Sequence, residues 1–289
     1  MRIPSLLCIA LLAMALQLRA EQPLPPLPPL TNPATMKLHP GKFVWADIFS
    51  NDVNATRRFY EQLFGWKLRW ISEPPDPYGI FSAAGYDVAG LAYRDIEGAD
   101  AYARWVHYLS VADASRTAQV VEQLGGRTLL AHSVADRGEF AIFSSANDVL
   151  LGAMTSSSGD PDDVQSMQGQ WIWWQLYVWD VDAAVSILKS IAPVEAQRAD
   201  DSEYGDMLLT SGGYARAGVT ALSAGSKEAP TWIGFVRVAD ATAMAARAKQ
   251  LGGRVLFETD DGDMAIVGDP GGALVGLVEY TYPDTEDAQ

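Results

Sequence analysis

The chain has 289 residues, 48% of them hydrophobic, and a formal net charge of −15. This length and apolar content are typical of about two globular domains. The strong negative charge argues against nucleic acid or an anionic membrane surface as a partner, so we predict neither.

Residues 1–20 have the pattern of a secretory signal peptide. Arg2 precedes a short apolar run followed by small residues, and cleavage is expected after Ala15 or after Ala20. The run is too short for a membrane span, although an uncleaved anchor is the alternative. Cys8 is the one cysteine of the chain, so the processed protein would hold no disulfide. We predict an exported protein of a bacterial periplasm or exterior, without a stable membrane span after processing.

Residues 21–38 contain the run Pro-Leu-Pro-Pro-Leu-Pro-Pro-Leu. Such a composition favours an extended, semi-rigid conformation. We therefore predict a tether between the cleaved end and the folded part, with a role as a ligand for another protein as the alternative.

A repeated unit follows the tether. The sequence Val-Ala-Asp-Ala at 111–114 recurs at 238–241, and Leu-Gly-Gly-Arg at 124–127 recurs at 251–254. In each copy the Asp suits a helix N-cap, apolar residues recur at helical spacing, and the glycines suit a helix end. Internal repeats of this kind indicate copies of one folded unit.

The same order of strand, helix and three strands can be assigned four times. The units begin near residues 41, 103, 171 and 230, and polar residues 156–168 separate the second from the third. We predict an α+β fold of four βαβββ modules in two domains. The predicted domains are 39–155 and 169–283, with 156–168 as the linker and 284–289 as an acidic tail.

Two motifs carry a resemblance to a known family. Residues 52–66 read Asp-Val-Asn-Ala-Thr-Arg-Arg-Phe-Tyr-Glu-Gln-Leu-Phe-Gly-Trp, and residues 268–273 read Gly-Asp-Pro-Gly-Gly-Ala. Together with the paired modules, they resemble the vicinal oxygen chelate superfamily, which includes glyoxalase I, bleomycin-resistance proteins and extradiol dioxygenases. Over residues 41–280 the chain is most similar to the two-domain branch named after a secreted mycobacterial antigen or called "hydroxylase".

The resemblance implies that each domain curls its sheet around a cavity, where the enzymes of the superfamily hold a divalent metal with His, Gln or Glu. The corresponding first-strand and last-strand positions here are Trp45, Val106, Trp173, Ile233, Gly152 and Gly276. None of these side chains coordinates a hard or borderline cation. We therefore expect no metal and no other cofactor.

Alternation along the first strands predicts which side chains face the cavities. They are Trp45, Asp47, Phe49, Tyr108 and Ser110 in the first domain and Trp173, Gln175, Tyr177, Phe235 and Arg237 in the second. Aromatic walls with a few polar groups are typical of small-molecule pockets. Arg237 near Gln175 leads to the hypothesis that the second domain binds an anionic or carbonyl-bearing aromatic ligand.

Other interpretations of the same residues stay open. The aromatic side chains would equally serve as core or domain-interface packing, and Asp47 or Arg237 would equally pair with an opposite charge. His107 has the parity opposite to the cavity face and is expected to pack towards its helix, and we predict no ligand role for His39 or His132.

The preferred interpretation is an exported, metal-independent protein that binds a small, partly aromatic molecule, as bleomycin-resistance relatives do. One alternative is a lyase, isomerase or hydroxylase-like enzyme that uses Asp47 as general base. Another is a structural or interaction protein whose cavities are filled by its own side chains. The sequence leaves the ligand and the oligomeric state open.

Overall fold

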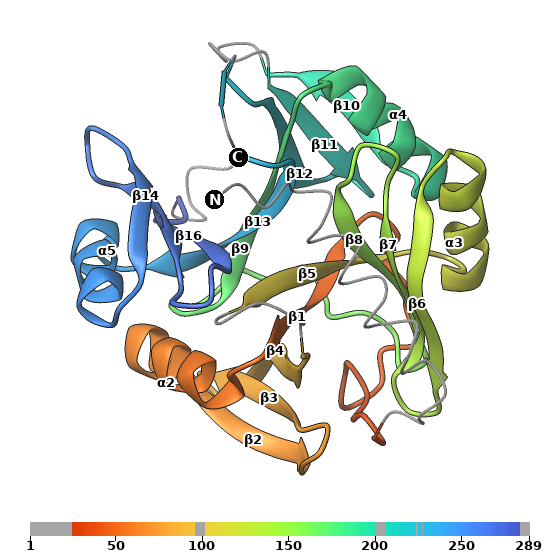
Figure 1. Cartoon of the computed structure of the whole chain (residues 1–289). Coiled ribbons are helices and arrows are strands. Elements are labelled where there is room, and N and C mark those ends of the chain that lie inside the picture. The colour runs from red at the N-terminus through yellow and green to blue at the C-terminus, as the bar shows by residue number, and fades with distance from the viewer. Residues whose placement is uncertain (1–24, 96–101, 200–205, 224, 227, 284–289) are drawn as a thin grey trace.

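The computed structural model describes residues 25–95, 102–199, 206–223, 225–226 and 228–283. The predicted signal peptide and the acidic tail lie outside these residues. The described chain forms four units of one strand, one helix and three strands (Figure 1). The first two units are β1 (Phe43–Ser50), α2 (Val53–Phe64), β2 (Lys67–Ser72), β3 (Tyr78–Ala83) and β4 (Tyr86–Tyr93), then β5 (Ala103–Ser110), α3 (Ala114–Gln123), β6 (Arg127–Val134), β7 (Gly138–Ser144) and β8 (Leu150–Ser156). The last two are β9 (Trp171–Val178), α4 (Val181–Ile191), β10 (Glu195–Arg198), β11 (Met207–Ser211) and β12 (Tyr214–Ala221), then β13 (Thr231–Val238), α5 (Ala241–Gln250), β14 (Arg254–Glu258), β15 (Met264–Gly268) and β16 (Leu274–Glu279).

Each pair of units shares one eight-stranded mixed sheet. The strand orders are β2-β3-β4-β1-β5-β8-β7-β6 and β10-β11-β12-β9-β13-β16-β15-β14. In both sheets the first strands of the two units pair antiparallel at the centre, and each also pairs in parallel with the last strand of its own unit. The predicted α+β fold of four paired βαβββ modules is confirmed.

An aspartate precedes each helix by one residue. The side chains of Asp52, Asp113, Asp180 and Asp240 accept hydrogen bonds from the backbone amides three residues later, at 2.9, 2.7, 2.9 and 2.7 Å. Such caps pair amides that the start of a helix leaves without a partner. Gly125 and Gly252 follow α3 and α5 with φ of 85° and 88°, the left-handed conformation expected at a helix end.

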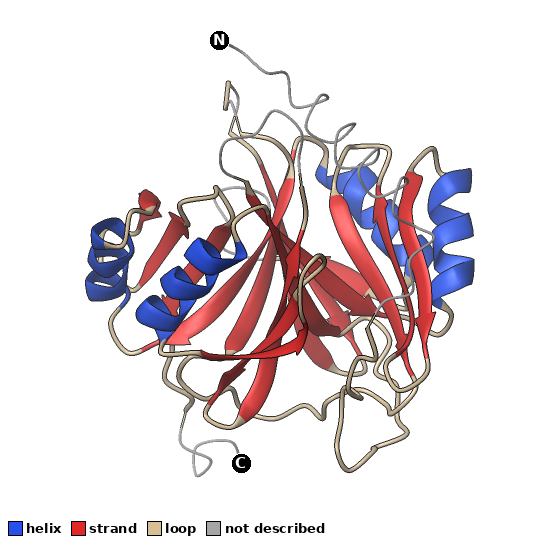
Figure 2. Cartoon of the chain, turned by 60° about the horizontal axis from the view of Figure 1, so that its bottom comes forward, coloured by secondary structure: helices blue, strands red, loops and turns tan. Residues whose placement is uncertain are grey.

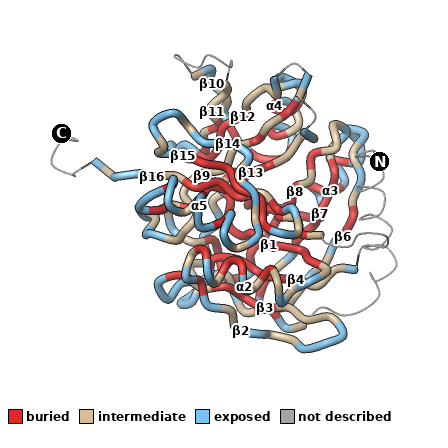
Figure 3. Tube along the Cα trace, turned by 60° about the vertical axis from the view of Figure 1, so that its left-hand side comes forward, coloured by how far each residue is buried: buried red, intermediate tan, exposed pale blue. Residues whose placement is uncertain are grey.

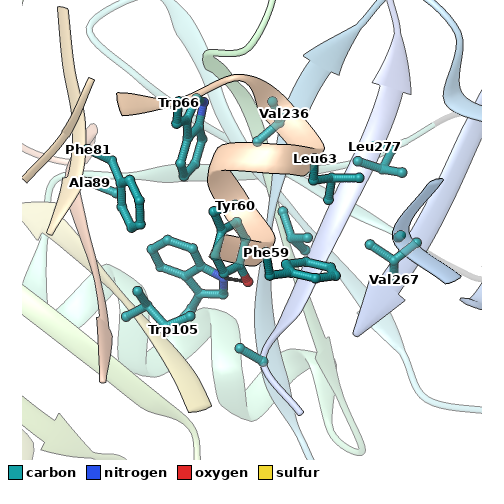
Figure 4. Close-up of a cluster of buried hydrophobic side chains, with 14 of the residues drawn as sticks. Phe59, Tyr60, Leu63, Trp66, Phe81, Ala89, Trp105, Val236, Val267 and Leu277 are labelled. Atoms are coloured by element: carbon teal, nitrogen blue, oxygen red, sulfur yellow. Dashed lines mark hydrogen bonds between the residues drawn. The ribbon is translucent and has the colours of Figure 1, made fainter. Parts of the chain in front are cut away.

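The core crosses between the two sheets. Helix α2 of the first unit contacts α5 of the fourth, and α3 of the second contacts α4 of the third. Figure 4 shows one shared cluster, in which Tyr60, Leu63 and Trp66 of the first unit lie near Val236 and Leu277 of the fourth. A second cluster joins the second and third units. Strands therefore run through the middle of the molecule, with the helices on its flanks (Figure 2).

Burial is highest along the central strands (Figure 3). Every residue of β1 is buried, whereas no residue of β2 or β14, which lie at sheet edges, is buried. Within the described ranges, no helix is both long enough and apolar enough to cross a membrane.

Residues 157–170 connect the two sheets and bring charged groups from both together. The Asp163 carboxylate lies 2.9 Å from Lys42 Nζ, just before β1, and 2.5 Å from Arg216 Nη1 on β12. Burial alone would raise the pKa of Asp163, but hydrogen bonds and charge from Arg216 and Lys42 lower it to about 2. This linker is a point of attachment between the domains.

Residues 25–30, here called the Pro-rich segment, pack on the first sheet, whereas the sequence predicts an extended tether. Leu27 is 7% exposed, and Leu30 packs against the same apolar cluster. Leucines three residues apart lie on one side of a polyproline helix, so the segment has an apolar face to bury. Thr31 anchors its end, because the Thr31 amide donates to Ser158 Oγ at 3.1 Å and its hydroxyl to Ser158 O at 2.9 Å.

Candidate functional site

Each first strand places one side chain across a glycine of the adjacent last strand. The four register pairs are Asp47 with Gly90, Tyr108 with Gly152, Gln175 with Gly218 and Phe235 with Gly276. In each pair, a Cβ on the glycine would overlap the first-strand side chain. Glycine in the last strand therefore leaves room for the first-strand side chain in each module.

The resemblance implies metal ligands at neighbouring positions of the same strands, Trp45, Val106, Trp173 and Ile233, and at Gly152 and Gly276. The four glycines offer no side-chain donor, and Trp45, Val106, Trp173 and Ile233 carry no group that binds a divalent cation well. Within the described part of the chain, no cluster of three or more His, Cys, Asp or Glu side chains could hold a metal ion. The residues present therefore do not fit the metal centre that the family implies.

The second sheet forms the wall of an open cavity of about 1300 Å³. Trp173, Gln175, Tyr177 and Phe235 line it, and Thr220 of β12 lies among them. Trp173 Nε1 donates to Gln175 Oε1 at 2.9 Å, and Gln175 Nε2 donates to Thr220 Oγ1 at 2.7 Å. Two hydrogen bonds therefore fix a neutral amide against an aromatic wall.

Tyr177 adds a hydroxyl to the same wall. Burial, followed by the nearby charge of Asp206, raises the pKa of Tyr177 to about 12. The hydroxyl therefore stays protonated at neutral pH and is able to donate a hydrogen bond to a ligand.

The equivalent face of the first sheet is almost filled. The remaining cavity is about 100 Å³, and its lining includes Leu27 together with Asp47, Phe49 and Tyr108. Trp45 belongs to the same apolar cluster as Leu27. Of the first-sheet residues predicted to face a cavity, Asp47, Phe49 and Tyr108 line it, and the Pro-rich segment lies against them.

Asp47 is surrounded by hydrogen-bond donors. Trp45 Nε1 donates to Asp47 Oδ1 at 2.9 Å, the Tyr78 hydroxyl donates at 2.8 Å, and Tyr108 donates as well. Burial raises the pKa of Asp47, and these donors and the charge of Arg137 only partly oppose that effect. The Arg137 guanidinium is buried 4.3 Å above the centre of the Trp45 ring.

Trp45, Ser110 and Arg237 do not line either cavity, contrary to the prediction from strand alternation. The buried Ser110 hydroxyl donates to Asp160 Oδ2 at 2.5 Å. Arg237 Nε donates to the Tyr280 carbonyl and Nη1 to the Ser166 carbonyl, both at 2.7 Å. The pairing of β13 with β9 ends where Val236 lies opposite Trp171, so Arg237 is one residue beyond it. There Arg237 is bound by Ser166 of the linker and by Tyr280, which follows β16.

Sequence reasoning missed three side chains of these faces. Thr220 follows Gly218 by two residues on β12, so strand alternation would have identified it. Tyr78 begins β3 and Arg137 lies in the turn before β7, where no local pattern indicates which way a side chain points.

The histidines lie apart from the second cavity. His107 is buried away from the cavity face, as its parity predicts, but it packs against Trp171 and Trp174 of the second sheet and not towards its helix. Trp174 Nε1 donates to His107 Nδ1 at 3.3 Å. Burial lowers the pKa of His107 to about 3, so the ring is neutral. His132 borders the small first cavity, and His39 lies near Asp162 of the linker.

Comparisons with known proteins agree with this architecture. Residues 42–143 match the family model described as the Glyoxalase/Bleomycin resistance protein/Dioxygenase superfamily. The chain is 28% identical to the anthracycline biosynthesis protein DauV of Streptomyces sp. (strain C5), over 86% of this chain and 97% of that protein. It is 24% identical to the putative glyoxylase CFP32 of Mycobacterium bovis, over 81% of this chain and 93% of that one.

Solved structures share the fold at low identity. A Mn(II)-bound glyoxalase from Novosphingobium aromaticivorans has a TM-score of 0.56 at 14% identity, covering 83% of this chain and 82% of that one. Homoprotocatechuate 2,3-dioxygenase from Brevibacterium fuscum has a TM-score of 0.57 at 13% identity, covering 87% and 86%. Residues 42–143 thus match a glyoxalase/bleomycin resistance protein/dioxygenase domain, and the second sheet repeats the strand order of the first.

Proposed function

We propose that this protein binds a small, partly aromatic molecule in the cavity of the second sheet. The observation that carries the proposal is the cavity of about 1300 Å³ over Trp173, Gln175 and Phe235. Its space exceeds the range of about 300–1,000 Å³ that is usual for ligand pockets. A ligand with several fused rings would fit there and leave room for water.

The polar groups beside the aromatic wall favour a ligand that carries carbonyl or hydroxyl groups. Gln175, Thr220 and Tyr177 are uncharged hydrogen-bonding groups. Elsewhere the lining is charged but of mixed sign, with Arg104, Arg254, Asp206 and Glu228. Arg237, the group that led to the hypothesis of an anionic ligand, is engaged by two backbone carbonyls. Relatives named for anthracycline biosynthesis support a fused-ring aromatic compound as the first ligand class to test.

Isothermal titration of the purified protein with an anthracycline tests the proposal. Gln175→Leu removes the hydrogen-bonding amide at similar volume and should weaken binding about tenfold, the value of one net hydrogen bond. Gln197→Leu, at an exposed position of β10, is the matched control and should bind as the wild type does. No detectable binding, or equal affinities for wild type and Gln175→Leu, would contradict the proposal.

A second candidate function is an enzyme with Asp47 as general base. Its support is the raised pKa of this buried carboxyl beside two tyrosine hydroxyls. Against it, the donors around Asp47 already occupy the carboxylate, and only about 100 Å³ remains open beside it. Ligand binding in the second domain is therefore the better supported function.

Export is a separate part of the proposal and rests on the signal-like residues 1–20. Expression of the full chain in a bacterium, followed by N-terminal sequencing of the fractionated protein, tests it. Periplasmic protein that begins at Leu16 or Glu21 is expected, and uncleaved protein in the cytoplasm would contradict it.

A further inference from the structure

The two sheets present equivalent concave faces in different states. Trp45, Asp47 and Tyr108 of the first sheet correspond in strand position to Trp173, Gln175 and Phe235 of the second. In both, the tryptophan indole donates a hydrogen bond to the side chain two residues later, at 2.9 Å. The second face is open over about 1300 Å³, whereas about 100 Å³ is left over the first.

The Pro-rich segment accounts for the difference. The buried Leu27 packs in one cluster with Phe49, Tyr108 and Phe140 of the first sheet. Its side chain therefore lies over the face that is open in the second domain.

The segment is held in a way that permits release. Four of its six residues are prolines, which have no backbone N–H to donate. Within the described chain, no hydrogen bond joins residues 25–30 to the sheet, and the first anchoring bonds are those of Thr31 with Ser158. Displacement of Leu27 would therefore break apolar packing and no backbone hydrogen bond.

We propose that the first sheet holds a second ligand site for a small, uncharged apolar group, and that Leu27 of the Pro-rich segment competes with the ligand for it. Phe49, Leu130 and Phe140 give the cavity apolar walls, and the hydroxyl groups of Tyr78 and Tyr108 are already directed at Asp47. Asp76, Arg94 and His132 complete the polar part of the lining. A single aromatic ring matches this lining, since apolar cavities of about 150 Å³ bind benzene. The site is independent of the ligand proposed for the second cavity.

Leu27→Ala tests the competition, because it removes three carbon atoms from the segment and leaves the walls intact. The probe is toluene, and ¹⁹F resonances of 3-fluorotyrosine at positions 108 and 177 report the first and second cavities separately. The two resonances are assigned with Tyr108→Phe and Tyr177→Phe. In Leu27→Ala, toluene should shift the Tyr108 resonance with an affinity at least tenfold higher than in wild type, because the site no longer has to open.

A second variant keeps the test decisive if Leu27→Ala folds poorly. Thr31→Val removes the hydroxyl bond to Ser158 and leaves Leu27 unchanged, so it should strengthen toluene binding by a smaller factor. Met36→Ala, at a residue that is 73% exposed, is the control and should match the wild type.

The outcomes separate this proposal from the proposed function. The competition is overturned if the Tyr108 resonance responds to toluene with the same affinity in wild type, Leu27→Ala and Thr31→Val. It is also overturned if that resonance does not move in either variant. A response at Tyr108 in Leu27→Ala supports this proposal even if no ligand is found for the second cavity.

Discussion

Gly218 lies directly opposite Gln175 in the parallel pairing of β12 and β9. A Cβ at position 218 would come 2.6 Å from Gln175 Nε2 and 2.7 Å from its Cδ. The amide that faces the second cavity therefore depends on the absence of a side chain on the neighbouring strand.

We expect Gly218→Ala to displace the Gln175 amide from Trp173 and Thr220. The loss of these hydrogen bonds should reduce the free energy of unfolding by about 1–2 kcal/mol, as measured by urea denaturation. In the Gln175→Ala background, where the obstructed side chain is absent, Gly218→Ala should reduce the free energy of unfolding by less than it does in the wild type. Strictly additive effects in this cycle would show that the two residues do not interact as described.

In the first domain, Tyr78 supplies one of the hydrogen bonds to the buried Asp47 carboxylate, at 2.8 Å. Tyr78→Phe should lower the free energy of unfolding by about 1–3 kcal/mol, because a buried acceptor loses a donor. Tyr86→Phe is the control, since Tyr86 is 62% exposed and its hydroxyl is replaceable by water, and it should change stability by less than about 0.5 kcal/mol. Equal melting curves for the two variants would argue against a structural role of the Tyr78 hydroxyl.

Local chemistry explains why the fold could be predicted from the sequence. A capping aspartate, helical spacing and a terminal glycine pair are short-range signals, and they repeat with the module, so each copy supports the others. Strand alternation then placed Trp173, Gln175 and Tyr177 on the face that lines the second cavity.

The errors concern contacts between segments that are distant in the sequence. The position of Leu27 over the first sheet depends on how a proline-rich run packs on strands far along the chain, and its composition alone favours a free tether. Arg237 has the expected parity, but it lies at the end of the strand pairing, where the carbonyls of Ser166 and Tyr280 bind it. Periodicity gives the face of a strand and does not reveal which segment covers its end.

The last prediction concerns Asp269, which belongs to the Gly-Asp-Pro-Gly turn of the fourth module and lies next to Tyr60 of the first. The two family-like motifs of the sequence therefore meet at the contact between the domains. Asp269 is 3% exposed, and burial raises its pKa to about 6, although backbone amides of the turn oppose the shift. The Ala273 amide donates to Asp269 Oδ1 at 2.9 Å.

A carboxyl whose pKa is higher in the folded state than in the unfolded chain binds its proton more tightly when folded. Its stabilising contribution is therefore complete below about pH 4 and is lost as the pH rises through about 6. Asp269→Asn keeps an oxygen acceptor for the Ala273 amide and removes the titration. Between pH 4 and pH 7, the free energy of unfolding of the wild type should fall by about 2–3 kcal/mol relative to this variant, as measured by urea denaturation at each pH. Parallel pH profiles for the two proteins would show that the Asp269 carboxyl is not held in the desolvated position beside Tyr60.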